Sequence, residues 1–201
     1  MRNLIIASLV LAAAPCWADS VCEVAALAGE AKSGTKVLAV GDKLDAGAEI
    51  RTSPKGRLRL KCVDGSSVVL GDNSELKIAE FRPAAGGQPR AATLLLTLGV
   101  MGQKVAPGGS WEVRTPSAVT AVRGTEFFVE VSAEQGTAVH VKEGEVGVEG
   151  VSRTRGIAPR PVIRLDRKSN GTQCTPAGGC AAAASWAPER VRDVQDKLAG
   201  V

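Results

Sequence analysis

Hydrophobic and polar residues alternate along much of the chain, which is the period of a β-strand with one buried face. The segment 57–63 is the clearest example, because Leu58, Leu60 and Cys62 share one face while basic residues occupy the other. The same period recurs at 75–81 and 126–131. Short alternating segments separated by turn residues are typical of all-β domains. We therefore predict an all-β fold of short antiparallel strands.

Turns that contain glycine separate these strands. Asp64-Gly65 lies between two alternating segments and predicts a two-residue hairpin of type I′, which needs two positive φ angles. Glu143-Gly144 predicts a second hairpin, between strands at 137–142 and 145–151 whose valines face inward. The segment 93–101 is almost continuously apolar, so both of its faces should be covered.

The most informative segment is 111–131, in which two alternating strands flank a passage that contains proline and glycine. Pro116 cannot donate a ladder hydrogen bond, so regular pairing should stop there. Gly124 allows a positive φ beside the charged guanidinium of Arg123. The passage between the strands should therefore form a buried corner. The residues that define this predicted structural motif are Thr115, Pro116, Arg123, Gly124, Thr125 and Phe127.

Three pieces of this region, taken in order, resemble the core motif of the FecR-type domain, a family named after a regulator of iron-dicitrate transport. They are Val113–Pro116, Ala121–Phe127 and the valine-rich stretch 139–148 around Glu143-Gly144. Earlier turns at Gly41-Asp42, Gly47–Thr52 and Asp64–Ser66 extend the resemblance over residues 21–151. The resemblance implies a coiled antiparallel sheet of β-solenoid or roll type. Periodicity by itself allows a sandwich, a barrel or a roll.

The first 18 residues are typical of a secretory signal peptide. Arg2 precedes an apolar run from Leu4 to Ala14, and small residues lead to a cleavage position after Ala18. The run is shorter than the about 20 residues that a membrane-spanning helix needs, and no second apolar stretch follows. We expect a periplasmic or secreted protein whose mature chain has no integral membrane segment. It should consist of a β domain at 19–151 and an extension at 152–201.

Four cysteines follow the predicted leader, and an even number in an exported chain favours two disulfides. Cys174 and Cys180 are six residues apart, so we favour their local pairing, which leaves Cys22 for Cys62, although the count allows three connectivities. A four-thiolate zinc site is the alternative. Zinc ligands usually come in close pairs, whereas Cys22 and Cys62 are isolated, so we expect no metal.

The extension should contain an edge strand at 162–166, the loop closed by the local disulfide, and a C-terminal helix at 188–200. Pro188 suits the first turn of that helix, Lys197 its last turn and Gly200 its end. A narrow apolar stripe indicates that the helix packs on the sheet, and a partner-binding helix is the alternative.

Charge and aromatic content narrow the classes of partner. Loss of Arg2 with the leader lowers the formal net charge from +4 to +3, which is too small and too dispersed to indicate nucleic acid. Aromatic residues make up 3% of the chain and tyrosine is absent. This composition argues against a site that stacks sugars or bases.

Few residues suggest catalysis. His140, the single histidine, alternates with Val139 and Val141, so it should face outward, and no nucleophile lies beside it in sequence. Arg123 has two interpretations. It could tie loop carbonyls or Glu126 across the corner, or it could hold a partner's carboxylate through a bidentate pair. We expect no catalytic residue and no cofactor.

Three functions from different classes remain. The resemblance implies a non-enzymatic module that contacts an unknown envelope protein in sensing, signalling or scaffolding. The best-known family members relay a signal from an outer-membrane receptor to a sigma factor, but we find no counterpart of the regions that serve this relay, so we expect only the general role. A module that binds an envelope polymer or a small ligand is the second hypothesis, and a hydrolase is the third.

Overall fold

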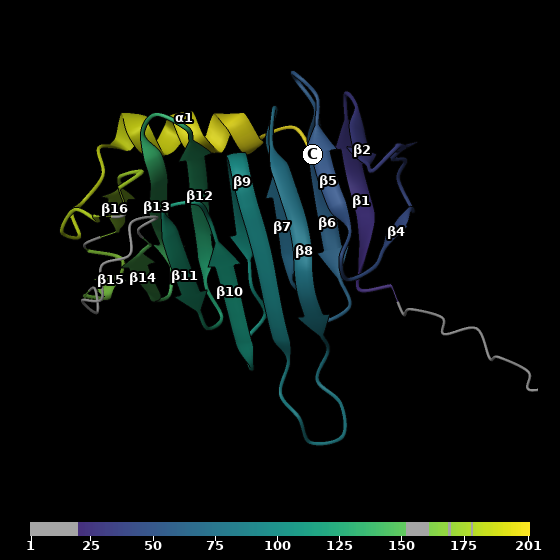
Figure 1. Ribbon diagram of the computed structural model, residues 1–201, viewed down its shortest axis with the longest axis horizontal. Coiled ribbons are helices and arrows are strands. Elements are labelled where there is room, and N and C mark those ends of the chain that lie inside the picture. Colours follow the sequence, from purple (N-terminus) through teal and green to yellow (C-terminus); the bar gives the residue numbers. More distant parts are fainter. Residues whose placement is uncertain (1–19, 152–160, 169, 178) are drawn as a thin grey trace, which may run out of the picture.

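The computed structural model describes residues 20–151, 161–168, 170–177 and 179–201, so the predicted signal peptide lies outside the described residues. Most of the described chain is β-strand, and one helix, α1 (Pro188–Leu198), follows the last strand (Figure 1). The predicted all-β class with a short C-terminal helix is therefore confirmed. The β-structure does not close on itself, and its strand pairs are antiparallel except for one.

The strands form two sheets that share one long strand, β9 (Ala91–Lys104). The other strands of the first sheet are β1 (Cys22–Ala28), β4 (Lys43–Leu44), β6 (Arg57–Cys62), β7 (Ser67–Leu70), β12 (Glu126–Ser132), β13 (Gly136–Glu143) and β16 (Gly171–Cys174). Those of the second sheet are β2 (Ala31–Ser33), β3 (Lys36–Val37), β5 (Glu49–Thr52), β8 (Glu75–Arg82), β10 (Ser110–Arg114), β11 (Ala118–Val122), β14 (Val146–Gly150) and β15 (Ile163–Leu165).

Strand β9 belongs to both sheets because it changes partners midway. Residues 91–98 pair with β8 and with β10, the one parallel partner, whereas residues 99–104 pair with β7 and β12. Gly99 lies at the change with a φ of +93°, and a Cβ added there would stand 2.5 Å from Ser74 Cα. The Ser74 hydroxyl in turn accepts a hydrogen bond from the Val100 amide at 3.0 Å. A side chain at position 99 would push the turn between β7 and β8 away.

One hydrophobic core fills the space between the two sheets. Leu58 and Leu60 of the first sheet and Ile50 and Ile78 of the second are each at most 1% exposed and belong to the same cluster. Every second residue is buried along β6 and β12, as the alternation predicted. Residues 100–103 of β9 are buried in succession, because α1 packs on Val100 at the outer side. The hydrophobic effect thus holds the sheets together.

The predicted hairpin around Glu143-Gly144 is wrong, although the valines on both sides are buried as expected. Strand β13 pairs with β12 and β16 in the first sheet, whereas β14 pairs with β11 and β15 in the second. The chain crosses between the sheets at Gly144, whose φ is +90°. A glycine turn between two alternating segments has the same sequence pattern whether the strands pair or separate.

The hairpin at Asp64-Gly65 forms between β6 and β7, but its turn is not of type I′. Gly65 has a positive φ, whereas Asp64 does not. The Asp64 carboxylate accepts hydrogen bonds from the Ser66 amide at 3.0 Å and from the Ser66 hydroxyl at 2.6 Å. It also pairs with the buried guanidinium of Arg90 at 2.6 Å. A contact with a residue distant in sequence therefore shapes this turn.

The structure contains the two disulfides that the sequence favoured. Cys22–Cys62 joins opposed positions of β1 and β6, and Cys174–Cys180 closes the loop that follows β16. Among the described residues, α1 is the only helix, and its 11 residues are too few to cross a membrane. The helix lies across the outer face of the first sheet, where Val194 and Leu198 are buried (Figure 1).

We predict that Gly99→Ala destabilises the protein far more than Gly41→Ala. The two glycines have nearly equal φ angles, +93° and +91°, but only position 99 is crowded. Backbone strain alone should cost about 1 kcal/mol at Gly41, and the added collision with Ser74 should raise the cost at Gly99 to about 3 kcal/mol or more. Urea unfolding of both variants measures the difference. Equal losses of unfolding free energy would show that β9 does not require a glycine where it changes partner strands.

A second prediction compares the disulfides. The Cys22–Cys62 bond spans 40 residues and the Cys174–Cys180 bond spans six. Because a longer closed loop restricts the unfolded chain more, replacing the first pair by alanine should cost about 4 kcal/mol and replacing the second about 2 kcal/mol. Urea unfolding under non-reducing conditions gives both values, and thiol titration of the mature protein without reductant should find no free cysteine. A greater loss from the local pair would contradict the loop argument.

Candidate interaction groove

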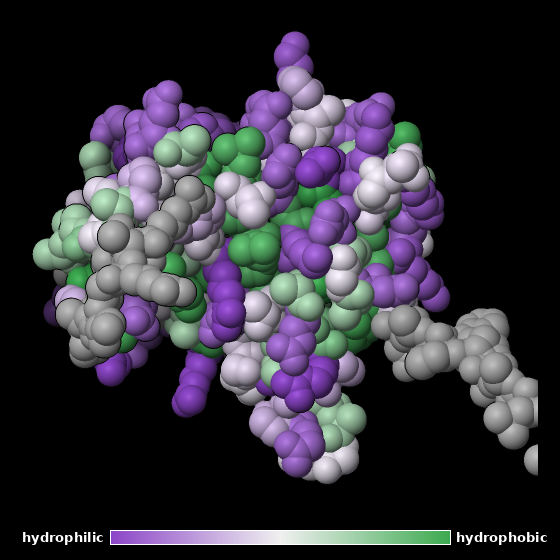
Figure 2. Space-filling view, viewed as in Figure 1, coloured by the Kyte–Doolittle hydropathy of each residue, from purple (hydrophilic) through white to green (hydrophobic). Residues whose placement is uncertain are grey.

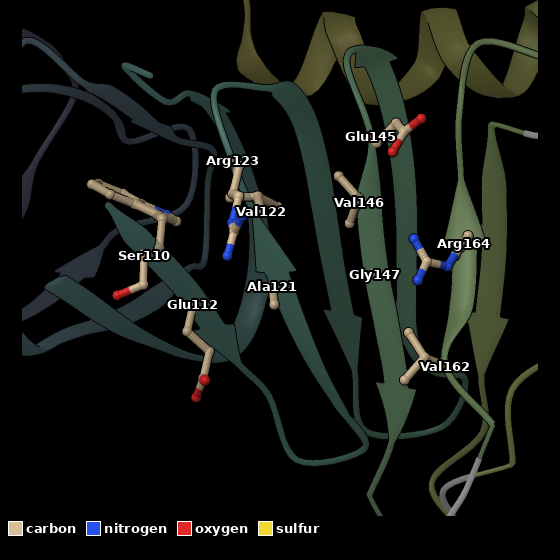
Figure 3. A pocket seen from close by; sticks show the side chains of 11 residues that line it. Ser110, Glu112, Ala121, Val122, Arg123, Glu145, Val146, Gly147, Val162 and Arg164 are labelled. Carbon is tan, nitrogen blue, oxygen red and sulfur yellow. The ribbon is translucent and has the colours of Figure 1, made fainter. Parts of the chain in front are cut away.

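An open groove lies on the outer face of the second sheet, where β10, β11, β14 and β15 run side by side (Figure 3). Its volume is about 780 Å³. The residues that line it are Ser110, Trp111, Glu112, Ala121, Val122, Arg123, Glu145, Val146, Gly147, Val162 and Arg164. The edge strand β15, which the sequence predicted at 162–166, forms one side.

Small residues make the floor of the groove. Ala121 on β11 and Gly147 on β14 lie directly opposite each other in the pairing register. Their neighbours Val122 and Val146 point into the core, so alternation sends positions 121 and 147 outward. A larger side chain at either position would fill the space between the walls. The shape of the groove therefore follows from two small residues on adjacent strands.

Charged side chains stand around this floor. Figure 3 shows Arg123 and Arg164 on opposite sides, with Ala121 and Gly147 between them. Both arginines are exposed, and neither makes a hydrogen bond or ion pair with a residue that the structure describes. Glu112, also at the groove, pairs with Arg114. Two guanidinium groups are thus available to a partner's acidic groups.

The first interpretation of Arg123, a side chain that ties the corner together, is wrong, because Arg123 makes no such contact with a described residue. Glu126, the acid suggested as its partner, instead accepts a hydrogen bond from Lys142 at 2.6 Å. Arg123 follows the last residue of β11 and is exposed, because the chain turns there from one sheet toward the other. The alternative interpretation, a guanidinium that can hold a partner's carboxylate, is the one that its position allows.

Thr115 and Pro116 belong to the turn between β10 and β11. The Thr115 hydroxyl lies 2.7 Å from that of Thr137 on β13, and the Ser117 hydroxyl lies 2.7 Å from the same Thr137 oxygen. All three hydroxyls are buried. This cluster joins a turn of the second sheet to a strand of the first, so Thr115 acts in folding.

Gly124, Thr125 and Phe127 also have structural positions. A Cβ at Gly144 would stand 2.5 Å from Thr125 Cγ2 and 3.3 Å from the Gly124 carbonyl oxygen. The two crossings between the sheets, from β11 to β12 and from β13 to β14, therefore lie against each other. Phe127 is fully buried in the core. Of the six motif residues, Arg123 is the one that lines the groove.

The prediction that His140 faces solvent is also wrong, since its side chain is only 4% exposed. Alternation places it on the outer side of β13 as expected, but Trp186 and Phe128 cover it there. Burial lowers the pKa of the imidazole from its usual 6.5. His140 and the groove belong to different sheets, so this imidazole is not part of the groove.

The groove can bind through ion pairs and hydrogen bonds. The described residues contain no group of three His, Cys, Asp or Glu side chains placed to hold a metal ion.

Sequence reasoning missed Arg164 and Glu145 as groove residues, because nothing local shows that β15 joins β14 or that β14 joins β11. The sequence feature that could have identified Arg164 was its place in a short alternating segment beside Leu165, which is buried.

Comparisons with known proteins agree with the sequence motif. The model of the FecR protein family matches residues 48–147. Two crystal structures of a candidate anti-sigma factor from Parabacteroides distasonis ATCC 8503 share the fold, with 20% and 21% sequence identity and TM-scores of 0.52 and 0.53. Each match covers 67% of this chain and 60% of the solved one. No curated protein matches. The chain therefore carries a FecR-type domain.

Proposed function

We propose that this chain is an exported, non-enzymatic FecR-type module that acts by protein–protein contact in envelope sensing, signalling or scaffolding. The match of residues 48–147 to the FecR family carries the proposal. The two disulfides support export, because such bonds persist in oxidising compartments. The candidate anti-sigma factor that shares the fold supports a signalling role, without naming the partner.

The domain organisation that we propose has a signal peptide at 1–18, a β domain at 19–151 and an extension at 152–201. Two strands of the extension add to the sheets of the β domain: β15 pairs with β14, and β16 pairs with β13. The extension also forms one wall of the groove, through Arg164. It therefore completes the contact surface of the domain.

The groove is the site that we propose for the partner. Its two unpaired guanidinium groups fit a partner segment that carries carboxylates, and a planar guanidinium can hold a carboxylate through two parallel hydrogen bonds. The small floor residues Ala121 and Gly147 leave room for the backbone of an extended segment. Exposed charged pairs of this kind give specificity and fast association more than high affinity.

Polymer binding has less support. A carbohydrate site usually offers a free aromatic face, but Trp111 is 1% exposed and Trp186 packs against His140. Hydrolysis has less support still. His140 is on the other sheet, and Glu112 of the groove is paired with Arg114.

We predict that Arg123→Ala and Arg164→Ala each weaken binding to the partner by about 10- to 100-fold, the effect of losing a charge-assisted hydrogen bond. Arg51→Ala is the matched control, because Arg51 is an exposed arginine of the second sheet outside the groove. The mature protein and its variants are immobilised, and envelope proteins that they retain are identified and titrated. If all three variants retained the partner as well as the unaltered protein does, the groove would be excluded as its binding site. Sedimentation of the protein with purified cell-wall polymer would favour polymer binding.

The same variants test whether Arg123 contributes to folding. Because its side chain is exposed and has no partner among the described residues, Arg123→Ala should change the free energy of unfolding by no more than about 0.5 kcal/mol. Thr115→Val should cost about 1–3 kcal/mol, since it leaves the buried Thr137 hydroxyl and the Ala118 amide with one partner fewer. Thermal unfolding compares them. A large loss of stability in Arg123→Ala would instead show that Arg123 stabilises the corner.

A further inference from the structure

His140 lies in a stack of three rings on the outer side of the first sheet. The Phe128 ring centre is 5.9 Å from the imidazole centre with planes 21° apart, and the Trp186 ring centre is 5.2 Å away. Phe128 comes from the neighbouring strand β12, opposite His140 in the register. Trp186 comes from the segment that leads into α1. The stack is thus the contact between β13 and the start of the helix.

The imidazole has no polar partner among the residues that the structure describes. Both ring nitrogens are buried, and neither makes a hydrogen bond with a described residue. A neutral imidazole carries one N–H and an imidazolium carries two, so protonation would bury a charge with two unsatisfied donors. Such a charge is strongly disfavoured unless it is paired. Contact with the aromatic faces offsets only part of this cost.

The charged groups around the stack are already paired with each other. On β12, Glu126 accepts a hydrogen bond from Lys142 of β13 at 2.6 Å. Glu130, also on β12, pairs with Lys197 of α1 at 2.7 Å and with Arg190. The remaining neighbours are uncharged. They are Gly171 of β16 opposite His140, Gly102 of β9 beside Phe128, and Asn170, whose side-chain oxygen accepts a hydrogen bond from the Trp186 amide. Arg190 lies 5.0 Å from the Trp186 ring centre, which places a positive charge near the stack.

The helix is lightly attached to the sheet. Its buried residues are Val194 and Leu198, which form a small cluster with Val100 that is separate from the main core. No side chain caps its N-terminus. Val69, Phe128 and Trp186 pack against this cluster, Glu130 forms ion pairs with the helix, and Arg57 donates hydrogen bonds to its last-turn carbonyls. Arg59 donates a hydrogen bond to the carbonyl of the terminal residue, Val201. An isolated helix of this length is marginal in water, so α1 depends on these contacts.

We propose that protonation of His140 releases Trp186 and α1 from the first sheet, so that the C-terminal segment is a strap that opens in acid. The imidazolium can regain water only if Trp186 moves away. Trp186 is two residues before Pro188, so its departure removes the anchor at the start of the helix. Opening would uncover the outer side of β9 and β12 at Val100 and Phe128. The groove on the second sheet lies outside this change.

The direction of the pH effect follows from the geometry and from burial. Because burial holds the pKa of His140 below 6.5 in the docked state, the released state binds a proton more readily, and acid favours release. The effect begins as the pH falls below about 6.5, and the ratio of released to docked helix should then rise by up to about tenfold per pH unit. At higher pH the docked state should not depend on this group.

Fluorine NMR of the mature protein labelled with 5-fluorotryptophan tests the proposal. Trp186→Phe assigns the Trp186 resonance, and the core residue Trp111 reports whether the domain stays folded. Between about pH 8 and pH 5 we expect the Trp186 signal to move to that of a solvated indole while the Trp111 signal stays unchanged. His140→Phe, which keeps a ring in the stack, should abolish the response. Glu130→Gln removes two attachments of α1, so it should move the midpoint to higher pH while the response itself remains.

Three outcomes would overturn the proposal. The Trp186 signal could stay constant over the whole range. The response could persist in His140→Phe and disappear in Glu130→Gln, which would identify the carboxylate as the sensor. The Trp111 signal could change together with that of Trp186, which would show acid unfolding of the whole domain. If His140→Phe fails to fold, His140→Gln replaces it, because an amide also does not titrate.

Discussion

The fold depends on places where two backbones approach too closely for a side chain. At Gly99 strand β9 leaves one sheet for the other against Ser74, and at Gly144 the chain crosses between the sheets against Thr125. Both glycines have positive φ angles, so close approach and backbone conformation demand the same residue. Because each crossing sets which strand pairs with which, the two sheets and the core between them follow from these points.

The sequence motif is mainly a signature of this architecture. The Thr115 hydroxyl joins the turn of the second sheet to Thr137 of the first, the Gly124-Thr125 crossing lies against Gly144, and Phe127 fills the core. Recognising the family therefore identifies the scaffold, and function must be argued from the residues that the scaffold leaves exposed. Within the motif this residue is Arg123, and its counterpart across the groove, Arg164, lies outside the motif.

The sequence predicted strands and buried faces well, because alternation is a local property. It did not predict which strands pair. The segment around Glu143-Gly144 has the pattern of a hairpin, yet its strands lie in different sheets. His140 shows the second limit. Alternation correctly placed it on the outer side of β13, but a tryptophan 46 residues later covers that side. Arg164 was missed for the same reason, since its place beside the groove comes from pairing between distant strands.

The two outer faces of the molecule differ in what covers them. The first sheet carries α1, whereas the second has the open groove between charged side chains. Figure 2 shows hydrophilic residues interspersed with hydrophobic ones in its view. The extension causes this difference, because it supplies α1 to one face and Arg164 to the other. A scaffold fixed by its crossings cannot easily change shape. A short segment added at the sheet edges changes the residues that each face exposes without changing the packing of the core.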